Sequence, residues 1–133
     1  MFKLLVNEEG SDAAARLWTP ERRLTSSLLV YPELRAALAM AVRTGRLDAD
    51  GASDVAARLE ARFAELTVID LTAELAREAG HLAERHGLRG YGAVHLASAL
   101  VAEVQLDDIL LVTWDEDLAR AARRDGLPVA GLA

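Results

Sequence analysis

The chain lacks cysteine, and it has few aromatic residues, no long apolar run and fewer basic than acidic side chains. The absence of cysteine excludes disulfides, thiolate metal sites and cysteine nucleophiles, and it fits a cytoplasmic protein. Aromatic residues form only 5% of the chain, which favours helices over an all-β sandwich and leaves no base-stacking platform. The longest apolar run is Ala36–Val42, far shorter than the roughly 20 residues of a membrane span, so no membrane partner is expected.

The charge balance bears on the choice of partner. A net charge of −6 does not favour broad electrostatic binding of nucleic acid. The objection is incomplete, because enzymes that cleave phosphodiesters with Mg²⁺ gather carboxylates and let the cation meet the phosphate. Basic residues also occur in three local groups, which are either solvated helix faces or contacts for a nucleic-acid backbone or an acidic partner. They are Arg22-Arg23, Arg85-His86 with Arg89, and Arg120 with Arg123-Arg124.

With 133 residues and 52% hydrophobic side chains, the chain is expected to form one domain over residues 1–133. Short β-rich runs alternate with helical patterns, which predicts an α/β fold with a mainly parallel sheet. The expected strands are Leu24–Ser27, Thr67–Asp70, Ile109–Trp114 and, at an edge, Leu127–Val129. Five helices are expected with clear bounds: Met1–Val6, Asp12–Trp18 after an N-cap at Ser11, Leu28–Arg43, Tyr91–Val104 and Glu116–Arg124. A further helix is opened by Asp50 or Ser53 and buries the stripe Val55, Leu59, Phe63 and Leu66. Another is capped by Thr72 and ends at His86.

An acid stands where the clearest expected strand, Ile109–Trp114, gives way to a helix. Ligands gather at the carboxyl ends of strands in open parallel sheets, so Asp115 is placed for metal or ligand chemistry. A purely structural interpretation is also open, because aspartate at this position caps the following helix. Thr113 has two interpretations as well: its hydroxyl orients a carboxylate, or its β-branched side chain packs the strand end. Asp117 lies beside them in the first helical turn.

Three other positions invite a chemical interpretation. Glu33 lies near the start of a predicted helix, where the helix dipole alone also favours an acid. His95 and Ser98 share one face of an apolar helix, which favours a partly buried, hydrogen-bonded histidine over a metal ligand. Gly92 lies at the start of that helix, where Asp, Ser or Asn is usual. The chain has neither a Gly-rich phosphate loop nor a Gly-x-Ser-x-Gly elbow, and its histidines lack zinc spacing.

Four segments, in order along the chain, resemble the motifs of the PIN-domain family, specifically the VapC-type toxins of bacterial toxin–antitoxin pairs. Each segment alone is weakly specific, whereas four in register over the whole length are fairly specific. Met1–Ser11 resembles the segment after the family's opening strand, Ser26–Glu33 its second motif, Tyr91–Leu100 its third, and Thr113-x-Asp115-x-x-Leu118 its fourth.

The resemblance implies a PIN-like three-layer α/β/α sandwich with an acidic cluster that binds Mg²⁺ or Mn²⁺. It implies an endoribonuclease that cleaves RNA, forms homodimers and is blocked by a cognate antitoxin protein. Glu33 and Asp115 correspond to catalytic, metal-binding acids of the family, with Thr113 and Asp117 as auxiliary positions. Among the basic side chains, Arg89 is the candidate RNA contact.

Two of the family's four acids are absent. The family's first strand and its aspartate are expected before Met1, so the chain resembles an N-terminally truncated domain, and Gly92 occupies the position of the third acid. The two remaining carboxylates would hold Mg²⁺ weakly, because this ion gives up its waters reluctantly, and an impaired or inactive enzyme is expected. Three explanations stay open: a reading frame begun at an internal methionine, an inactivating Asp-to-Gly substitution, or a natural member that only binds.

The missing strand has a structural consequence, because in the family it lies in the middle of the sheet. Without it, either the sheet rearranges or another chain fills the gap. The alternative function is a non-catalytic PIN-like module that dimerises or grips an antitoxin helix, with Glu33 and Asp115 only stabilising helix ends. A phospho-accepting signalling domain built on Asp115 ranks last, because a companion acidic pair and a suitably placed lysine are lacking.

Overall fold

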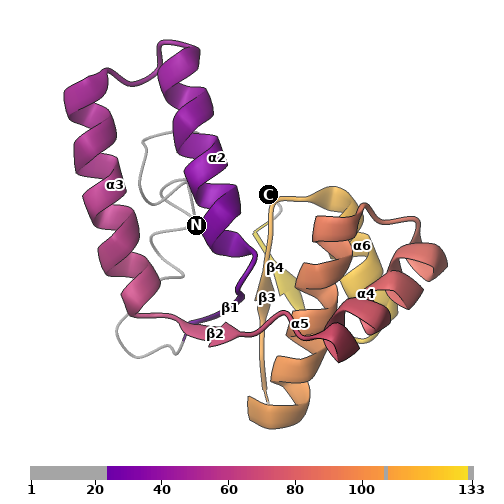
Figure 1. Cartoon of the computed structure of the whole chain (residues 1–133). Helices are drawn as coiled ribbons and strands as arrows, with labels where there is room; N and C mark the ends of the chain where they lie inside the picture. The colour runs from indigo at the N-terminus through magenta and orange to yellow at the C-terminus, as the bar shows by residue number, and fades with distance from the viewer. Residues whose placement is uncertain (1–23, 107, 132–133) are drawn as a thin grey trace. The chain divides into compact units, whose positions relative to one another are not determined.

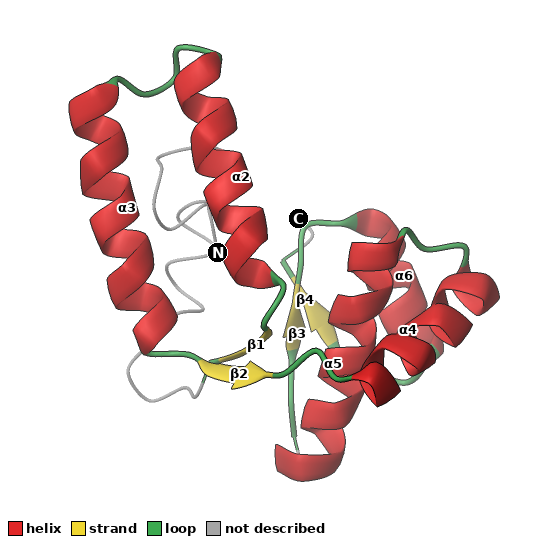
Figure 2. Ribbon diagram, in the orientation of Figure 1, coloured by secondary structure: helices red, strands yellow, loops and turns green. Residues whose placement is uncertain are grey.

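A computed structural model describes residues 24–106 and 108–131, and the structural statements below refer to these residues. The expected helices Met1–Val6 and Asp12–Trp18, the cap Ser11 and the pair Arg22-Arg23 lie outside them. Five helices and four short strands follow in the order β1, α2, α3, β2, α4, α5, β3, α6 and β4 (Figures 1 and 2). The expected α/β class is confirmed, because helices alternate with short parallel strands.

The chain forms two compact units. The first, called here the helical hairpin, contains α2 (Val30–Arg43) and α3 (Ala49–Ala64). The second is called the α/β unit and combines Thr25–Leu29 with the chain from Val68 onward. It contains β1 (Thr25–Ser27), most of β2 (Thr67–Ile69), α4 (Ala73–His86), α5 (Gly90–Leu106), β3 (Leu111–Val112), α6 (Glu116–Arg124) and β4 (Val129–Ala130).

The helical hairpin is held by one apolar seam. A short loop joins α2 to α3, so the helices run side by side in opposite directions (Figure 1). Each contributes two buried side chains one helical turn apart, so their apolar stripes meet. These residues are Leu34 and Leu38 of α2 and Val55 and Leu59 of α3. Burial of the same stripe on α3 was expected from the sequence and is confirmed for its first two members.

The starts of both hairpin helices differ from the sequence expectation. The helix α3 is capped by Asp48, whose Oδ1 accepts a hydrogen bond from the Gly51 amide at 2.7 Å, so the expected caps at Asp50 and Ser53 were wrong. The earlier aspartate prevails because its carboxylate reaches an unpaired amide of the first turn. The helix α2 begins at Val30 rather than two residues earlier. The preceding turn is tied by the Ser27 hydroxyl, which accepts from the Leu29 amide at 3.1 Å.

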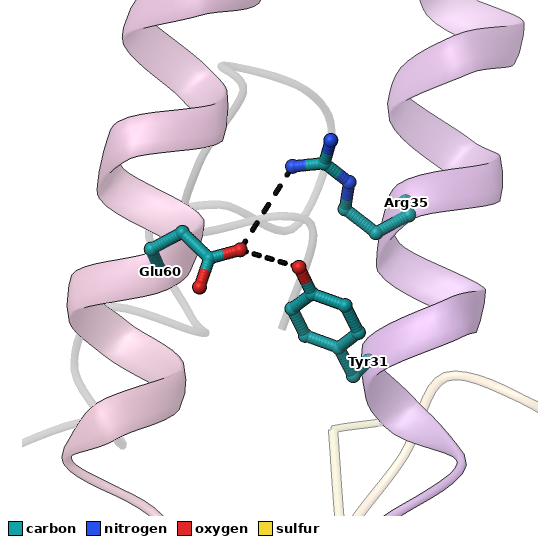
Figure 3. A network of polar contacts seen from close by, with 3 residues as sticks. All are labelled: Tyr31, Arg35 and Glu60. Atoms are coloured by element: carbon teal, nitrogen blue, oxygen red, sulfur yellow. Dashed lines mark hydrogen bonds and ion pairs between the residues drawn. The ribbon is translucent and has the colours of Figure 1, made fainter.

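A polar network on the hairpin surface links α2 to α3 (Figure 3). The Tyr31 hydroxyl donates to Glu60 Oε1 at 2.5 Å, and Arg35 Nη1 lies 3.9 Å from the same oxygen. The Tyr31 ring also packs against Phe63, with ring centroids 5.0 Å apart. The hydrogen bond to Glu60 is the main cause that raises the pKa of Tyr31 above 10.0, followed by desolvation and by repulsion from the same carboxylate.

The strands form two parallel pairs rather than one continuous sheet. In the first pair, the amide of Thr67 donates to Leu24 and the amide of Leu28 donates to Ile69, each at 2.9 Å, so partners advance together along both strands. The second pair joins β3 to β4, with Val112 opposite Ala130. Among residues 24–106 and 108–131, the strands therefore make two separate two-stranded sheets.

The second pair is shorter than its sequence pattern predicts. The expected strand Ile109–Trp114 is reduced to two residues, because β4 offers only two partners for it. The expected edge strand began at Leu127, but this side chain is 2% exposed and belongs to the core. Pro128 then accepts from the Leu111 amide at 3.0 Å, and pairing begins at Val129.

The core of the α/β unit surrounds α5, which packs against α4, β1 and α6. The caps expected for α4 are confirmed: the Thr72 hydroxyl accepts from the Leu75 amide at 3.1 Å, and Gly87 adopts the left-handed conformation at the other end. The far ends of α4 and α6 are joined by a partly buried pair, His86 Nε2 and Asp125 Oδ2, 3.0 Å apart. No helix in residues 24–106 or 108–131 is long and apolar enough to cross a membrane.

Replacing Leu96 by alanine is expected to lower the free energy of unfolding by about 2–5 kcal/mol, because this fully buried side chain leaves a cavity at the centre of the core. Chemical denaturation followed by circular dichroism measures the change. Val104→Ala is the matched control on the same helix, since Val104 is 83% exposed and its truncation is expected to cost less than about 0.5 kcal/mol. Equal losses in both variants would contradict the described core.

Removing the Glu60 carboxylate is expected to return the pKa of Tyr31 toward 10.0, because that carboxylate is the main cause of the increase. Since the folded-state pKa is the higher one, the contribution of this bond is present below the ordinary pKa and is lost as the pH rises through the raised value. Absorbance titration of Glu60→Ala in a Tyr91→Phe background reads Tyr31 alone, because the chain has two tyrosines. Glu65→Ala, which removes the ion pair with Arg62 instead, should leave the titration unchanged.

Candidate active site

The junction between β3 and α6 brings together two of the predicted site residues. The Thr113 hydroxyl accepts a hydrogen bond from the Asp115 amide at 3.0 Å. Asp115 Oδ1 in turn accepts from the Leu118 amide at 3.0 Å and caps α6. Thr113 is buried and Asp115 is exposed, so a carboxylate is held at the strand end and presented to solvent.

Both interpretations given to Asp115 from the sequence are therefore compatible. The cap employs Oδ1, and a carboxylate has a second oxygen that can coordinate a cation. The Thr113 hydroxyl is bound to the backbone amide of Asp115, whereas one interpretation of the sequence had it orient a carboxylate. Asp117 points to a different partner, because its Oδ1 lies 2.9 Å from Arg120 Nη2 on the exposed face of α6. Asp117 and Arg120 lie about one helical turn apart and form a surface ion pair, which stabilises α6 slightly.

The start of α5 carries two more of the predicted positions. Gly92 is buried in the first turn, and a Cβ atom placed on it meets no atom of the described residues within 4 Å. The position therefore has room for a side chain. Arg89 precedes the helix, and its guanidinium carbon lies 5.1 Å from the centroid of the exposed Tyr91 ring. This cation–π contact orients an exposed positive charge at the helix start.

Glu33 belongs to the helical hairpin, where it lies in the first turn of α2. The side chain is half-buried, and its Oε1 atom has almost no exposed surface. The dipole of α2 favours an acid at this position. Asp115 belongs to the α/β unit, so Glu33 and Asp115 belong to different units of the chain. Within the described parts of the chain, no group of three or more Asp, Glu or His side chains is arranged to hold a metal ion.

Sequence reasoning missed a close contact next to Thr113. Gly131, directly after β4, has a φ of +104°, and a Cβ atom built on it would lie 2.7 Å from the Thr113 carbonyl oxygen. Only glycine fits both the backbone angle and the approach. A glycine after an edge strand carries no local signal for this role, because the constraint comes from another strand.

Comparison with known proteins identifies the family to which the chain belongs. The PIN domain family profile matches residues 1–124, and the chain belongs to the PIN-domain family. It is similar to Ribonuclease VapC45 of Mycobacterium tuberculosis (strain CDC 1551 / Oshkosh) and to Ribonuclease VapC49 of Mycobacterium tuberculosis (strain ATCC 25618 / H37Rv). Each is 42% identical over 128 residues, which cover 96% of this chain and 88% of the relative. The VapC-type resemblance found in the sequence is confirmed.

Replacing Asp115 by alanine is expected to lower the free energy of unfolding by about 1 kcal/mol, because α6 loses its N-terminal cap. Asp115→Asn should preserve stability within a few tenths of a kcal/mol, since asparagine caps helices as well as aspartate does. Thermal unfolding of the two variants measures the difference. An alanine variant as stable as the parent would contradict the cap, and the asparagine variant supplies a folded protein that lacks only the charge.

Proposed function

We propose that this chain is a metal-dependent endoribonuclease of the VapC type, the toxin of a toxin–antitoxin pair, with a weakened metal site. The proposal is carried by the 42% identity to two proteins named as ribonucleases over nearly the whole chain, together with the PIN domain match. The Asp115 carboxylate, fixed at a strand end and exposed, supplies the chemistry that such an enzyme needs.

The donor chemistry of the chain fits a hard divalent cation. Mg²⁺ binds through one or two carboxylates, waters and substrate phosphates rather than through an all-protein cage. Asp115 and Glu33 are the proposed ligands, with Thr113 and Asp117 as auxiliary residues, and the metal is Mg²⁺ or Mn²⁺. A bound cation lowers the pKa of water and neutralises charge that develops on the scissile phosphate. Glycine at position 92 removes one carboxylate from the family's set, which weakens binding and impairs the reaction.

The protein's own residues have separate tasks in this scheme. Thr113 orients the backbone that carries Asp115, so the carboxylate keeps a fixed direction. Arg89, steadied by the Tyr91 ring, guides the RNA phosphate from the start of α5. The proposed partners are a single-stranded RNA substrate, a cognate antitoxin and a second copy of the chain, in the cytoplasm. Exposed apolar side chains such as Met40 and Val104 are available for protein partners to cover.

Two observations favour a second function. Asp115 is fully explained as a helix cap, and the described residues contain no cluster of three metal-binding groups. A PIN-like module that dimerises or binds an antitoxin without cleaving RNA meets both facts. The two functions differ in what they expect of a divalent cation: the enzyme requires it, whereas the module is indifferent to it.

Restoring a carboxylate at position 92 is expected to strengthen Mn²⁺ binding about tenfold or more and to raise Mn²⁺-dependent cleavage of single-stranded RNA. Among the described residues, a Cβ atom at position 92 has no neighbour within 4 Å, and the added carboxylate is a ligand type that such a cation accepts. Calorimetric titration with Mn²⁺ and a gel assay of RNA cleavage measure the two effects in the parent chain, in Gly92→Asp and in Gly92→Asp combined with Asp115→Asn.

Gly90→Asp is the matched control, because it adds the same charge to the same helical turn, also in open space, at an exposed position. It should leave both measurements unchanged. Asp115→Asn should abolish the gain of Gly92→Asp. If Gly92→Asp neither binds Mn²⁺ nor cleaves RNA, the enzyme is excluded and the binding module is favoured.

A further inference from the structure

Gly131, which follows β4, lies close to the backbone of Thr113, the residue that follows β3 and leads into the candidate site. A Cβ atom at Gly131 would lie 2.7 Å from the carbonyl oxygen of Thr113 and 3.2 Å from its carbon and nitrogen. These neighbours are backbone atoms, which cannot turn aside as the end of a flexible side chain can. The φ of +104° is also one that other residues rarely adopt. Any side chain at this position therefore displaces Thr113.

Thr113 connects that contact to the acid. Its amide donates to the carbonyl of Ala130 at 3.1 Å, so the strand end is bound to the residue just before Gly131. Its hydroxyl accepts from the Asp115 amide at 3.0 Å. Asp115 Oδ1 then accepts from the Leu118 amide at 3.0 Å. A continuous series of short contacts thus runs from the end of β4 to the first turn of α6.

We propose that Gly131 is a positioning residue for Asp115: the chain after β4 fixes the backbone of Thr113, and Thr113 fixes the direction of the Asp115 carboxylate. The inference deepens the proposed function and rests on it, because the direction of the carboxylate matters for chemistry only if Asp115 binds the cation. The contacts that link Gly131 to Asp115 through Thr113 include no acidic side chain other than that of Asp115. Gly131 is thereby part of the site's construction.

The test compares Gly131→Ala with Gly126→Ala. Gly126 also has a positive φ, +87°, but a Cβ atom there meets nothing within 4 Å, so the control carries the backbone strain without the contact. Amide hydrogen exchange of Asp115 and Leu118 reports the two hydrogen bonds of the junction. The Leu75 amide, bound to the Thr72 hydroxyl in the equivalent cap of α4, serves as the reference in the same unit.

Gly131→Ala is expected to accelerate exchange at Asp115 and Leu118 by about fivefold or more, the effect of weakening one hydrogen bond, while Leu75 stays unchanged. Exchange like that of Gly126→Ala would overturn the proposal. An equal rise at all three amides would also overturn it, because it would report general destabilisation rather than a local constraint.

A chain ended after Ala130 provides a second variant that removes the contact without adding a clash. The β3–β4 bonds remain available, since both β4 residues are retained. Faster exchange confined to Asp115 and Leu118 is again expected, and unchanged exchange would contradict the role of Gly131. This variant decides the question by itself if Gly131→Ala fails to fold.

Titration with Mn²⁺ separates failure of this inference from failure of the proposed function. If Asp115→Asn leaves Mn²⁺ binding unchanged, Asp115 is no ligand and the proposed function fails, whatever the exchange result. If Asp115→Asn weakens binding, Gly131→Ala should also weaken it, by more than Gly126→Ala does. A normal Mn²⁺ affinity in Gly131→Ala would then refute the inference while the proposed function stands.

Discussion

The α/β unit depends on the burial of α5. This helix contacts α4, α6 and β1, and its buried positions are mostly small residues together with the fully buried Leu96. Small side chains such as Ala93 and Ala97 allow neighbouring elements to pack closely against α5. Most of the buried apolar surface of the unit therefore lies around this helix. An interior of this kind needs polar groups satisfied locally. Ser98 is an example, because its hydroxyl donates to the Val94 carbonyl at 2.8 Å within the same helix.

The site inherits its rigidity from this core. The helix α6 is anchored by Leu118 and by alanines that pack in the cluster around α5, and its far end is joined to α4 by the His86–Asp125 pair. Because α6 is packed against the core, the Asp115 carboxylate is held by its bond to the Leu118 amide although the residue is exposed. The polar groups of the candidate site thus lie at the start of α6, and the apolar residues that stabilise the helix lie on its buried face.

Local signals explain what could be predicted from the sequence. The caps at Thr72 and Asp115 were found because the side chain that caps and the amide that donates lie within three residues. The bounds of α6 were predicted correctly for the same reason. The length of β3 was not, because a strand extends only as far as its partner, and β4 is set by the burial of Leu127. The Asp48 cap was missed because three candidate residues lie close together at the start of α3, namely Asp48, Asp50 and Ser53.

In the candidate site too, contacts between residues close in sequence were predicted, whereas contacts between distant residues were not. Asp115 and Thr113 were identified from an abrupt change of pattern over a few residues, and the contact between them is local. Gly131 gave no signal, because its constraint arises from a backbone strand distant in sequence. The Tyr31–Glu60 bond was invisible for the same reason, since it joins two helices through side chains that look like ordinary surface residues. Room beside Gly92 is likewise a property of its neighbours and not of glycine itself.

The order of the elements has one more consequence. The chain leaves the α/β unit after Leu29, forms the hairpin and returns at Val68 to pair β2 with β1. Two parallel neighbours need a crossover of only about a dozen residues, so the hairpin is far longer than the pairing demands. Among the described residues, the hairpin has its own buried cluster and a capped helix, α3. The pairing of β1 with β2 therefore sets a minimum length for this connection, and the apolar contact between α2 and α3 sets the rest of it.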